Sequence, residues 1–417
     1  MSKYKIQPCK NLTGEVSISG SKNSSLPILS AALLNNKETR LKNIPNLSDI
    51  ENMYKLMRYC GAEIKKSDDN QVIINSRSIV SKKLPLETVN KLRGSFLLIA
   101  PILSRCGIIR IPYPGGCAIG ARPIDLHLKG FVKMGASVKQ CHGYVELTCD
   151  KLQPADIYLD FPSVGATENI MIAASNIVGE TTIENAATEP EIEDLANFLT
   201  KMGAEINGAG TDTIKIVGSK TLKSASHTVI PDRIEAGTFL TFAAITKSNI
   251  KIKNVIPEHL KPITAKLCEM GFILNECDGS LEIFPGEKIK KADIKTLPHP
   301  GFPTDMQAQF MSLLSVIDGT SVLIETVFEN RFMQVPELLR MGAKIKVDGR
   351  TAIIDGTKKL SGTKVKATDL RAGAALVAAS LVASGETEIE NSALIERGYE
   401  NFEEKLLSLG VKIKKYE

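Results

Sequence analysis

One pattern of hydrophobic and polar positions recurs six times along the 417 residues. Each copy is an amphipathic stretch that ends at a glycine and is followed by short runs of alternating apolar and polar residues. The glycines that mark the copies are Gly61, Gly135, Gly203, Gly271, Gly342 and Gly410, at spacings of 74, 68, 68, 71 and 68 residues. A structural repeat of about 70 residues therefore accounts for the whole chain.

The residues around each glycine predict a helix followed by a hairpin. Residues 195–203 form an amphipathic helix in this interpretation, and Gly203 ends it because glycine adopts a left-handed conformation without a Cβ clash. The alternating runs 204–206 and 213–217 then predict two strands joined by a turn. Residues 344–354 repeat the pattern in the fifth copy.

A second helix, made almost entirely of small and apolar residues, precedes the amphipathic one, and a strand separates the two. A helix that is apolar around most of its circumference is buried, whereas an amphipathic helix lies at the surface. The six apolar segments are 27–34, 96–103, 170–177, 239–245, 310–317 and 372–382. Each repeat thus reads helix, strand, helix, strand, strand, and the six predict an α/β protein of two globular lobes with three units each.

Composition narrows the function classes. A net charge of +5 is spread over 417 residues and Trp is absent, so no basic, aromatic surface for nucleic acid is indicated. The eight cysteines contain no C-x-x-C pair and the five histidines no zinc pattern, which favours reduced thiols and no metal site. The N-terminus has no apolar signal region, and the apolar run 372–383 is too short to span a bilayer. We therefore expect a cytoplasmic protein without a membrane partner.

Polar residues gather at the first turn of each apolar helix. Ser, Thr and Asp at such positions are explained by capping of the helix N-terminus. Lysine and arginine need another explanation, because a cation opposes the helix dipole at this end. The four cations at these positions are Lys22, Arg93, Arg233 and Arg371. They predict an anion site built from helix N-termini and cationic side chains.

Residues 114–123 form the least core-like stretch of the chain, with two prolines and three glycines. Cys117 lies there, five residues before Arg122. A cysteine is most often a small buried hydrophobic residue, but a nearby cation tunes a thiol for proton transfer or nucleophilic attack.

These residues closely resemble the UDP-N-acetylglucosamine 1-carboxyvinyltransferases of the enolpyruvyl transferase family. The likeness extends over essentially the whole chain, and its motifs lie at residues 19–23, 114–123, 163–167, 302–307, 328–332 and 367–371. The resemblance implies an inside-out α/β barrel with two lobes, each of three βαβαββ repeats. Residues 1–21 with 230–417 would form lobe one, and residues 22–229 lobe two, which carries the Cys117 loop.

The resemblance also implies the reaction. The enolpyruvyl group of phosphoenolpyruvate would pass to the 3′-hydroxyl of UDP-N-acetylglucosamine by addition and elimination, with release of phosphate and without a cofactor, as the first committed step of peptidoglycan synthesis. Cys117 would protonate C3 of phosphoenolpyruvate, and Asp305 would take the proton of the hydroxyl group. The other catalytic residues would be Lys22, Arg93 and Arg397.

The substrate-binding residues that the resemblance implies come from both halves of the chain. They are Lys22, Asn23, Arg93, Arg122, Pro123, Ile124, Asp125, Leu126, Ser163, Val164, Gly165, Asp305, Val327, Arg331, Asp369, Arg371 and Arg397. This chain differs from some members of the family at residues 160–162. These residues are Asp-Phe-Pro here, where those members have a lysine that would contact the diphosphate.

Two other functions fit parts of the pattern. The sister enzyme that uses shikimate 3-phosphate shares the fold and the reaction type, but the Cys117 loop and residues 122–125 favour the sugar nucleotide. A non-catalytic sensor of sugar nucleotides would not need to keep both an acid and a base. Solvated surface positions remain the alternative interpretation of Arg331 and Arg397, and capping that of Asp305.

Overall fold

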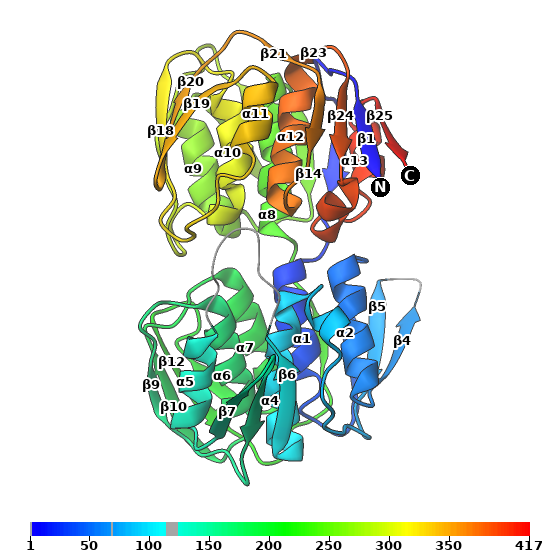
Figure 1. Cartoon of the computed structure of the whole chain (residues 1–417), viewed down its shortest axis with the longest axis vertical. Helices are drawn as coiled ribbons and strands as arrows, with labels where there is room; N and C mark the ends of the chain where they lie inside the picture. Colours follow the sequence, from blue (N-terminus) through cyan, green and yellow to red (C-terminus); the bar gives the residue numbers. More distant parts are fainter. Residues whose placement is uncertain (1, 68–69, 114–123) are drawn as a thin grey trace. The chain divides into compact units, whose positions relative to one another are not determined.

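The computed structural model describes residues 2–67, 70–113 and 124–417. They form two compact units, which we call unit 1 (residues 2–19 and 231–417) and unit 2 (residues 20–113 and 124–230). Both units follow one plan, with helices in the interior and sheets outside (Figure 1).

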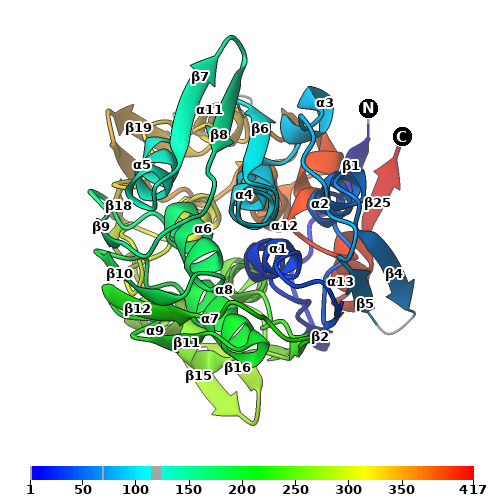
Figure 2. The same cartoon turned by 90° about the horizontal axis from the view of Figure 1, so that it is seen from below.

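Three buried helices pack against one another at the centre of each unit. Figure 2 shows this arrangement in unit 2, where strands surround α1, α4 and α6. The buried helices are α1 (Lys22–Ala31), α4 (Ile99–Cys106) and α6 (Val164–Ala174) in unit 2, and α8 (Arg233–Thr246), α10 (Gln307–Leu314) and α12 (Leu370–Val382) in unit 1. Short 3-10 helices lead into two of them, η1 (Arg93–Leu98) into α4 and η3 (Thr304–Met306) into α10. The six apolar segments are therefore the buried helices that the sequence predicts.

The amphipathic helices cover this centre. They are α2 (Ser48–Tyr59), α5 (Asp125–Lys133), α7 (Pro190–Met202), α9 (Lys261–Glu269), α11 (Val335–Arg340) and α13 (Phe402–Ser408). Three shorter helical turns are α3 (Leu86–Val89), η2 (Pro257–Leu260) and η4 (Ser392–Arg397). All six repeat glycines follow these helices with positive φ angles between +87° and +112°. The predicted helix ends are thus confirmed.

In the described residues, six sheets form the outer layers. In five of them the strand between the two helices pairs with one strand of a hairpin, whereas in the sixth it pairs with the N-terminal strand. In unit 2 the strand orders are β13 (Ser226–Thr228), β3 (Glu38–Lys42), β5 (Gln71–Asn75), β4 (Glu63–Ser67); β6 (Ile108–Pro112), β8 (Tyr144–Thr148), β7 (Ser137–Cys141); and β9 (Asp156–Tyr158), β10 (Gly179–Glu184), β12 (Thr213–Gly218), β11 (Glu205–Asn207). In unit 1 they are β2 (Glu15–Ser17), β14 (Ile250–Lys253), β16 (Ser280–Pro285), β15 (Phe272–Cys277); β17 (Ile294–Lys295), β18 (Thr320–Ile324), β20 (Thr351–Asp355), β19 (Lys344–Asp348); and β22 (Lys364–Lys366), β24 (Thr387–Glu390), β1 (Lys3–Ile6), β25 (Ile413–Tyr416). A further small pair is β21 (Leu360–Ser361) with β23 (Ala383–Ser384).

The hydrophobic pattern missed one strand in five of the six repeats. Before five of the buried helices lies a strand of two or three residues, such as β9, which runs parallel to β10. In the remaining repeat an isolated bridge between Lys83 and Arg110 takes its place. Two or three residues carry too little alternation to be recognised as a strand.

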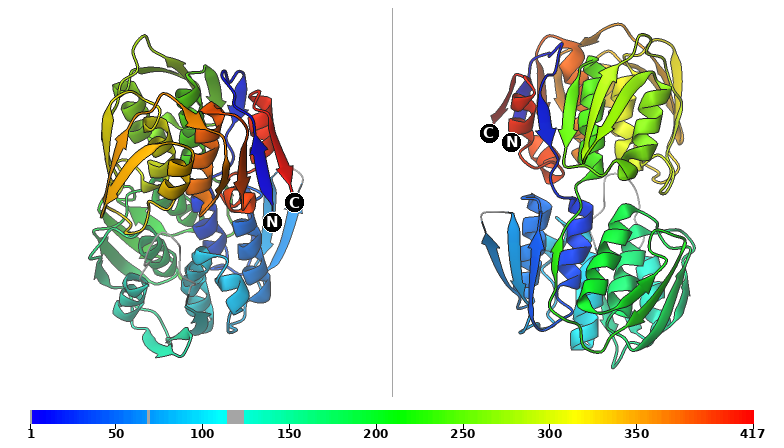
Figure 3. Two further views of the ribbon diagram at one scale, coloured as in Figure 1. Left: turned by 45° about the horizontal axis from the view of Figure 1, so that its top comes forward. Right: turned by 180° about the vertical axis from the view of Figure 1, so that it is seen from behind.

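Two of these short strands show where the chain passes between the units. β2 pairs with β14 in unit 1, yet the next helix, α1, belongs to unit 2. β13 pairs with β3 in unit 2, yet α8 follows it in unit 1. The strand β1 lies between β24 and β25, so the N-terminal segment completes the sixth repeat and lies beside the C-terminal one (Figures 1 and 3). Among the described residues, no helix is long and apolar enough to cross a membrane.

The glycines that end the amphipathic helices allow a test of the repeat. At Gly203, with φ +112°, an added Cβ would have nothing within 4 Å, so Gly203→Ala should cost only backbone strain, about 1–2 kcal/mol. At Gly61, with φ +97°, the Cβ would lie 2.2 Å from the carbonyl oxygen of Ser78, so Gly61→Ala should cost about 1–3 kcal/mol more. Urea unfolding of the two variants measures the difference, and equal losses would contradict it.

Candidate active site

In unit 1 a carboxylate is held between two buried guanidinium groups. Asp305 lies in η3, immediately before the buried helix α10. Its Oδ1 pairs with Nη2 of Arg331 at 2.6 Å, and its Oδ2 pairs with Nη2 of Arg371 at 3.1 Å. The two arginine side chains are 4% and 3% exposed, whereas Asp305 is 26% exposed. The carboxylate is therefore fixed by its partners and remains accessible.

Arg371 is the second residue of α12, and its environment favours an additional anion. The helix N-cap is Asp369, whose carboxylate accepts the backbone N–H groups of Arg371 and Ala372 at 2.7 and 3.0 Å. The guanidinium lies over the ring of Tyr399, 5.4 Å from its centroid. Its Nε and Nη1 are buried and make no hydrogen bond to the described residues. Unsatisfied buried donors of this kind are suited to a carboxylate or phosphate ligand.

Two further predicted residues lie in the same unit. Arg397 is the last residue of η4, and the next residue, Gly398, lies against Arg371, because a Cβ there would be 3.5 Å from Nη1 of Arg371. Val327 follows β18, and its backbone N–H donates to the carboxylate of Glu325 at 2.9 Å. The structure thus brings Asp305, Arg331 and Arg371 together and places the segment of Arg397 beside them.

In unit 2, Lys22 and Asn23 are the first two residues of α1, whose N-cap Ser21 accepts the N–H of Ser24 at 3.2 Å. The ammonium group of Lys22 lies 3.4 Å from a carboxylate oxygen of Asp49 on α2, and both side chains are buried. This carboxylate offsets the cation that the helix terminus disfavours.

A second helix N-terminus in unit 2 carries predicted nucleotide-binding residues. Ser163 caps α6 by accepting the N–H of Ala166 at 3.4 Å, and Val164 and Gly165 form the first turn. Gly165 leaves room for the His127 ring, since a Cβ there would lie 3.1 Å from Cε1 of His127. Ile124, Asp125 and Leu126, which were also predicted, lie at the start of α5, directly before His127.

His127 connects three segments of this region. Its Nδ1 accepts a hydrogen bond from Nδ2 of Asn169 at 2.8 Å, and the same amide donates to the backbone oxygen of Phe96 at 3.0 Å. Burial, and then the positive charge of Arg93 at the start of η1, lower the pKa of His127 to about 4. The imidazole is therefore neutral at pH 7, with its proton on Nε2.

The structure describes only some of the other residues named in the sequence analysis. Cys117, Arg122 and Pro123 lie outside the described residues. Arg233 is the first residue of α8, next to its N-cap Asp232. Asp160, in the segment before Ser163 where this chain differs from some members of the family, pairs with Lys129 on α5 at 2.7 Å.

The structure settles the capping alternative position by position. Capping is confirmed for Ser21, Ser163, Asp232 and Asp369. Asp305 is not the N-cap of η3, because Pro303 holds that position, and its carboxylate pairs with two arginines. The solvated-surface alternative is also wrong for Arg331, whose side chain is buried.

Several residues that shape the site were not found from the sequence. Asp49, His127, Asn169 and Glu325 are buried polar residues, and each has a partner from another segment of the chain. Their signal is a polar residue at a position that faces the core, which becomes informative only after the packing is known.

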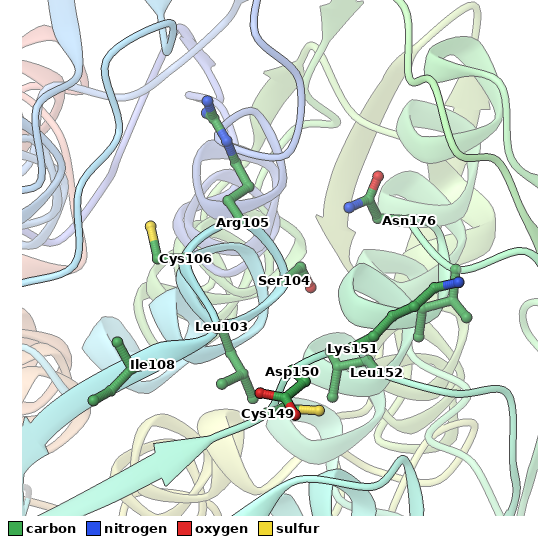
Figure 4. A pocket seen from close by; sticks show the side chains of 12 residues that line it. Leu103, Ser104, Arg105, Cys106, Ile108, Cys149, Asp150, Lys151, Leu152 and Asn176 are labelled. Carbon is green, nitrogen blue, oxygen red and sulfur yellow. The ribbon is translucent and has the colours of Figure 1, made fainter.

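A cavity of about 460 Å³ in unit 2 lies away from these residues. Its lining includes Leu103 to Ile108 at the C-terminal end of α4, Cys149 to Leu152, and Asn176 and Ile177 beyond the end of α6 (Figure 4). The predicted residues Arg93 and Ser163 lie at the opposite, N-terminal ends of these helical segments. The cavity is therefore separate from the candidate site.

Comparisons with known proteins agree with this architecture. Residues 6–406 match the family model described as EPSP synthase (3-phosphoshikimate 1-carboxyvinyltransferase). The chain is 55% identical over 417 residues to UDP-N-acetylglucosamine 1-carboxyvinyltransferase 2 of Carboxydothermus hydrogenoformans, covering 100% of this chain and 99% of the relative. It is 56% identical over 412 residues to UDP-N-acetylglucosamine 1-carboxyvinyltransferase 1 of Caldanaerobacter subterraneus subsp. tengcongensis, covering 99% of each.

Solved structures give the same result for the fold. The enolpyruvyl transferase NikO from Streptomyces tendae matches with a TM-score of 0.90 at 26% identity, covering 100% of this chain and 99% of that one. An EPSP synthase from Acinetobacter baumannii matches with a TM-score of 0.78 at 18% identity over 100% of both chains. The predicted fold class, a two-lobed inside-out α/β barrel, is thereby confirmed.

The buried His127 makes the stability of the protein depend on pH. An unfolded histidine has a pKa of about 6.5, so between pH 6.5 and 4 the unfolded chain binds a proton that the folded protein excludes. This contribution to stability is present above pH 6.5 and is lost as the pH falls. The variant His127→Asn keeps an acceptor for Asn169 but cannot titrate. Between pH 7 and pH 5 we expect its free energy of unfolding to fall by about 2 kcal/mol less than that of the parent. Denaturant unfolding at both pH values measures this, and equal losses would refute a neutral His127.

Proposed function

The chain belongs to the EPSP synthase family and, within it, to the UDP-N-acetylglucosamine 1-carboxyvinyltransferases, and we propose that it transfers the enolpyruvyl group of phosphoenolpyruvate to the 3′-hydroxyl of UDP-N-acetylglucosamine. Phosphate is the second product, and the reaction is the first committed step of peptidoglycan synthesis. The observation that carries the proposal is the accessible carboxylate of Asp305 between the buried guanidinium groups of Arg331 and Arg371.

In the addition step, the 3′-oxygen attacks C2 of phosphoenolpyruvate while C3 gains a proton. Asp305 takes the proton of the hydroxyl group, and Cys117 supplies the proton to C3. In the elimination step, C3 loses a proton, the C2–O bond to phosphate breaks, and the double bond forms again. The partial exposure of Asp305 supports its role, because a base must reach the proton that it removes.

Phosphoenolpyruvate carries a carboxylate and a phosphate group, and fixed cations offset their charge. The buried Nε and Nη1 of Arg371 lie on different edges of the guanidinium, and each offers a donor to such a group. Lys22, Arg93, Arg122, Arg331 and Arg397 complete the cationic set in this proposal. Asp49 holds the ammonium group of Lys22, so that this charge does not need a ligand to keep its position.

The nucleotide is proposed to lie along residues Ile124, Asp125, Leu126 and Val327, with Arg122 and Pro123, and with its diphosphate at the N-terminus of α6. The first backbone N–H groups of this helix have no partner within the helix, and its dipole favours negative charge there. Gly165 lets the His127 ring pack against this helix start, since a Cβ there would lie 3.1 Å from Cε1 of His127. Asn23 is proposed to position the amino sugar together with Asp305, and Asp369 to orient Arg371.

The substrate can be tested directly. We expect phosphate to be released from phosphoenolpyruvate when UDP-N-acetylglucosamine is added, and at a rate lower by at least about 100-fold with shikimate 3-phosphate, because a site built for one set of polar groups rejects a substrate that lacks them. A colorimetric phosphate assay measures both rates. A faster reaction with shikimate 3-phosphate would contradict the proposal.

The acid role of Cys117 can be separated from its nucleophilicity. Fosfomycin is an epoxide with a phosphonate group, and we expect the Cys117 thiol to open its strained ring and become alkylated. Cys117→Asp keeps a group that can carry a proton but is a poor nucleophile toward the epoxide, so this variant should turn over and resist the inhibitor. Cys117→Ala should lose both turnover and labelling.

Steady-state phosphate release and the intact mass after exposure to fosfomycin measure these outcomes. Cys277→Ala, which removes an exposed cysteine, is the matched control and should behave like the parent. Normal turnover of Cys117→Ala, or an adduct on another cysteine, would show that Cys117 is not the catalytic acid.

A further inference from the structure

Glu325 is a buried carboxylate to which neither the motifs nor the reaction assign a role. It follows β18 and is 1% exposed. Its Oε1 accepts the backbone N–H groups of Val327 and Phe328 at 2.9 and 3.1 Å, and its Oε2 accepts the hydroxyl of Thr304 at 2.9 Å. One side chain therefore joins two segments that meet at the candidate site.

The two joined segments carry different parts of the proposed chemistry. Thr304 directly precedes the base Asp305 in η3. Val327 belongs to the proposed nucleotide contact. Further contacts connect the two segments through Arg331. Its guanidinium carbon lies 5.4 Å from the centroid of the Phe328 ring, and its Nη2 pairs with Asp305 at 2.6 Å.

We propose that Glu325 is a positioning residue that sets the place of the base Asp305 relative to the segment 327–328. This inference rests on the proposed function, in which Asp305 accepts the proton of the sugar hydroxyl. A carboxylate with three donors in a buried setting has one favourable geometry, since moving either segment would leave a buried oxygen without a partner. A base displaced by about 1 Å can cost about 100-fold in rate.

The reach of the side chain, rather than its charge, is what joins the segments. Glu325→Gln keeps this reach: its oxygen can accept from Val327 and Phe328, and its amide can donate to the Thr304 hydroxyl, which also accepts. Glu325→Asp keeps the charge but is one methylene shorter. We expect Glu325→Gln to retain kcat within about 3-fold and Glu325→Asp to lose about 10- to 100-fold. The opposite order would overturn the inference.

Thr304→Val cuts the contact on the side of the base and leaves the contacts of Glu325 to residues 327–328 in place. We expect kcat to fall about 10- to 100-fold and KM for UDP-N-acetylglucosamine to stay within about 3-fold. Thr326→Val is the matched control, because it removes a hydrogen bond of the same loop, from the Thr326 hydroxyl to the Thr296 oxygen at 2.6 Å, that does not reach Asp305. It should keep the parental kcat.

The decisive experiment compares the single variant Asp305→Asn with the double variant that carries both Asp305→Asn and Thr304→Val. If Thr304 acts through Asp305, the second substitution should change the residual kcat by less than about 2-fold. The same loss in both backgrounds would overturn the inference. If Asp305→Asn loses turnover but Thr304→Val keeps the parental kcat, this inference is wrong and the proposed function stands. If Asp305→Asn keeps the parental turnover, the proposed function is wrong and this inference with it.

Discussion

The burial of the Arg371 guanidinium at the first turn of α12 is the interaction on which the rest of the site depends. Removing a charge from water costs several kcal/mol, and the positive end of the helix dipole opposes this cation further. Asp305, paired at 3.1 Å, supplies the compensating charge, and Asp369 holds the helix start to which Arg371 belongs. Asp305 is fixed as a consequence, and two buried donors of Arg371 remain for an anionic ligand.

One repeated unit produces different parts of a site because its helix starts differ in detail. At α6 and α12 the polar residue is a regular N-cap, and the proposed binding groups are backbone N–H groups at α6 and the neighbouring Arg371 at α12. At α10 a 3-10 turn follows Pro303, and no side chain caps it. Asp305 lies inside this turn and pairs with Arg331 and Arg371, so the start of the buried helix is built differently in this copy.

The sequence predicted what local physics determines. The six glycines end helices because they adopt a positive φ, and apolar segments such as 372–382 are buried because no face of them is polar. It missed strands such as β9, which three residues are too few to reveal, and it missed His127 and Glu325, whose partners Asn169 and Thr304 come from other elements. The cation at a helix start pointed to Arg371 and resemblance to a family pointed to Asp305 as a base, but their pairing and burial required the packed structure.

The central claim is that the enolpyruvyl group is transferred by adding a proton to C3 of phosphoenolpyruvate while the sugar hydroxyl attacks C2. Running the reaction in deuterium oxide and analysing the product by mass spectrometry and NMR tests this claim most directly. In the tetrahedral adduct, C3 is a methyl group that carries one solvent deuterium, and elimination removes any one of its hydrogens. The account predicts deuterium at the vinyl carbon of the product. A product that contains only protium at this carbon would contradict it.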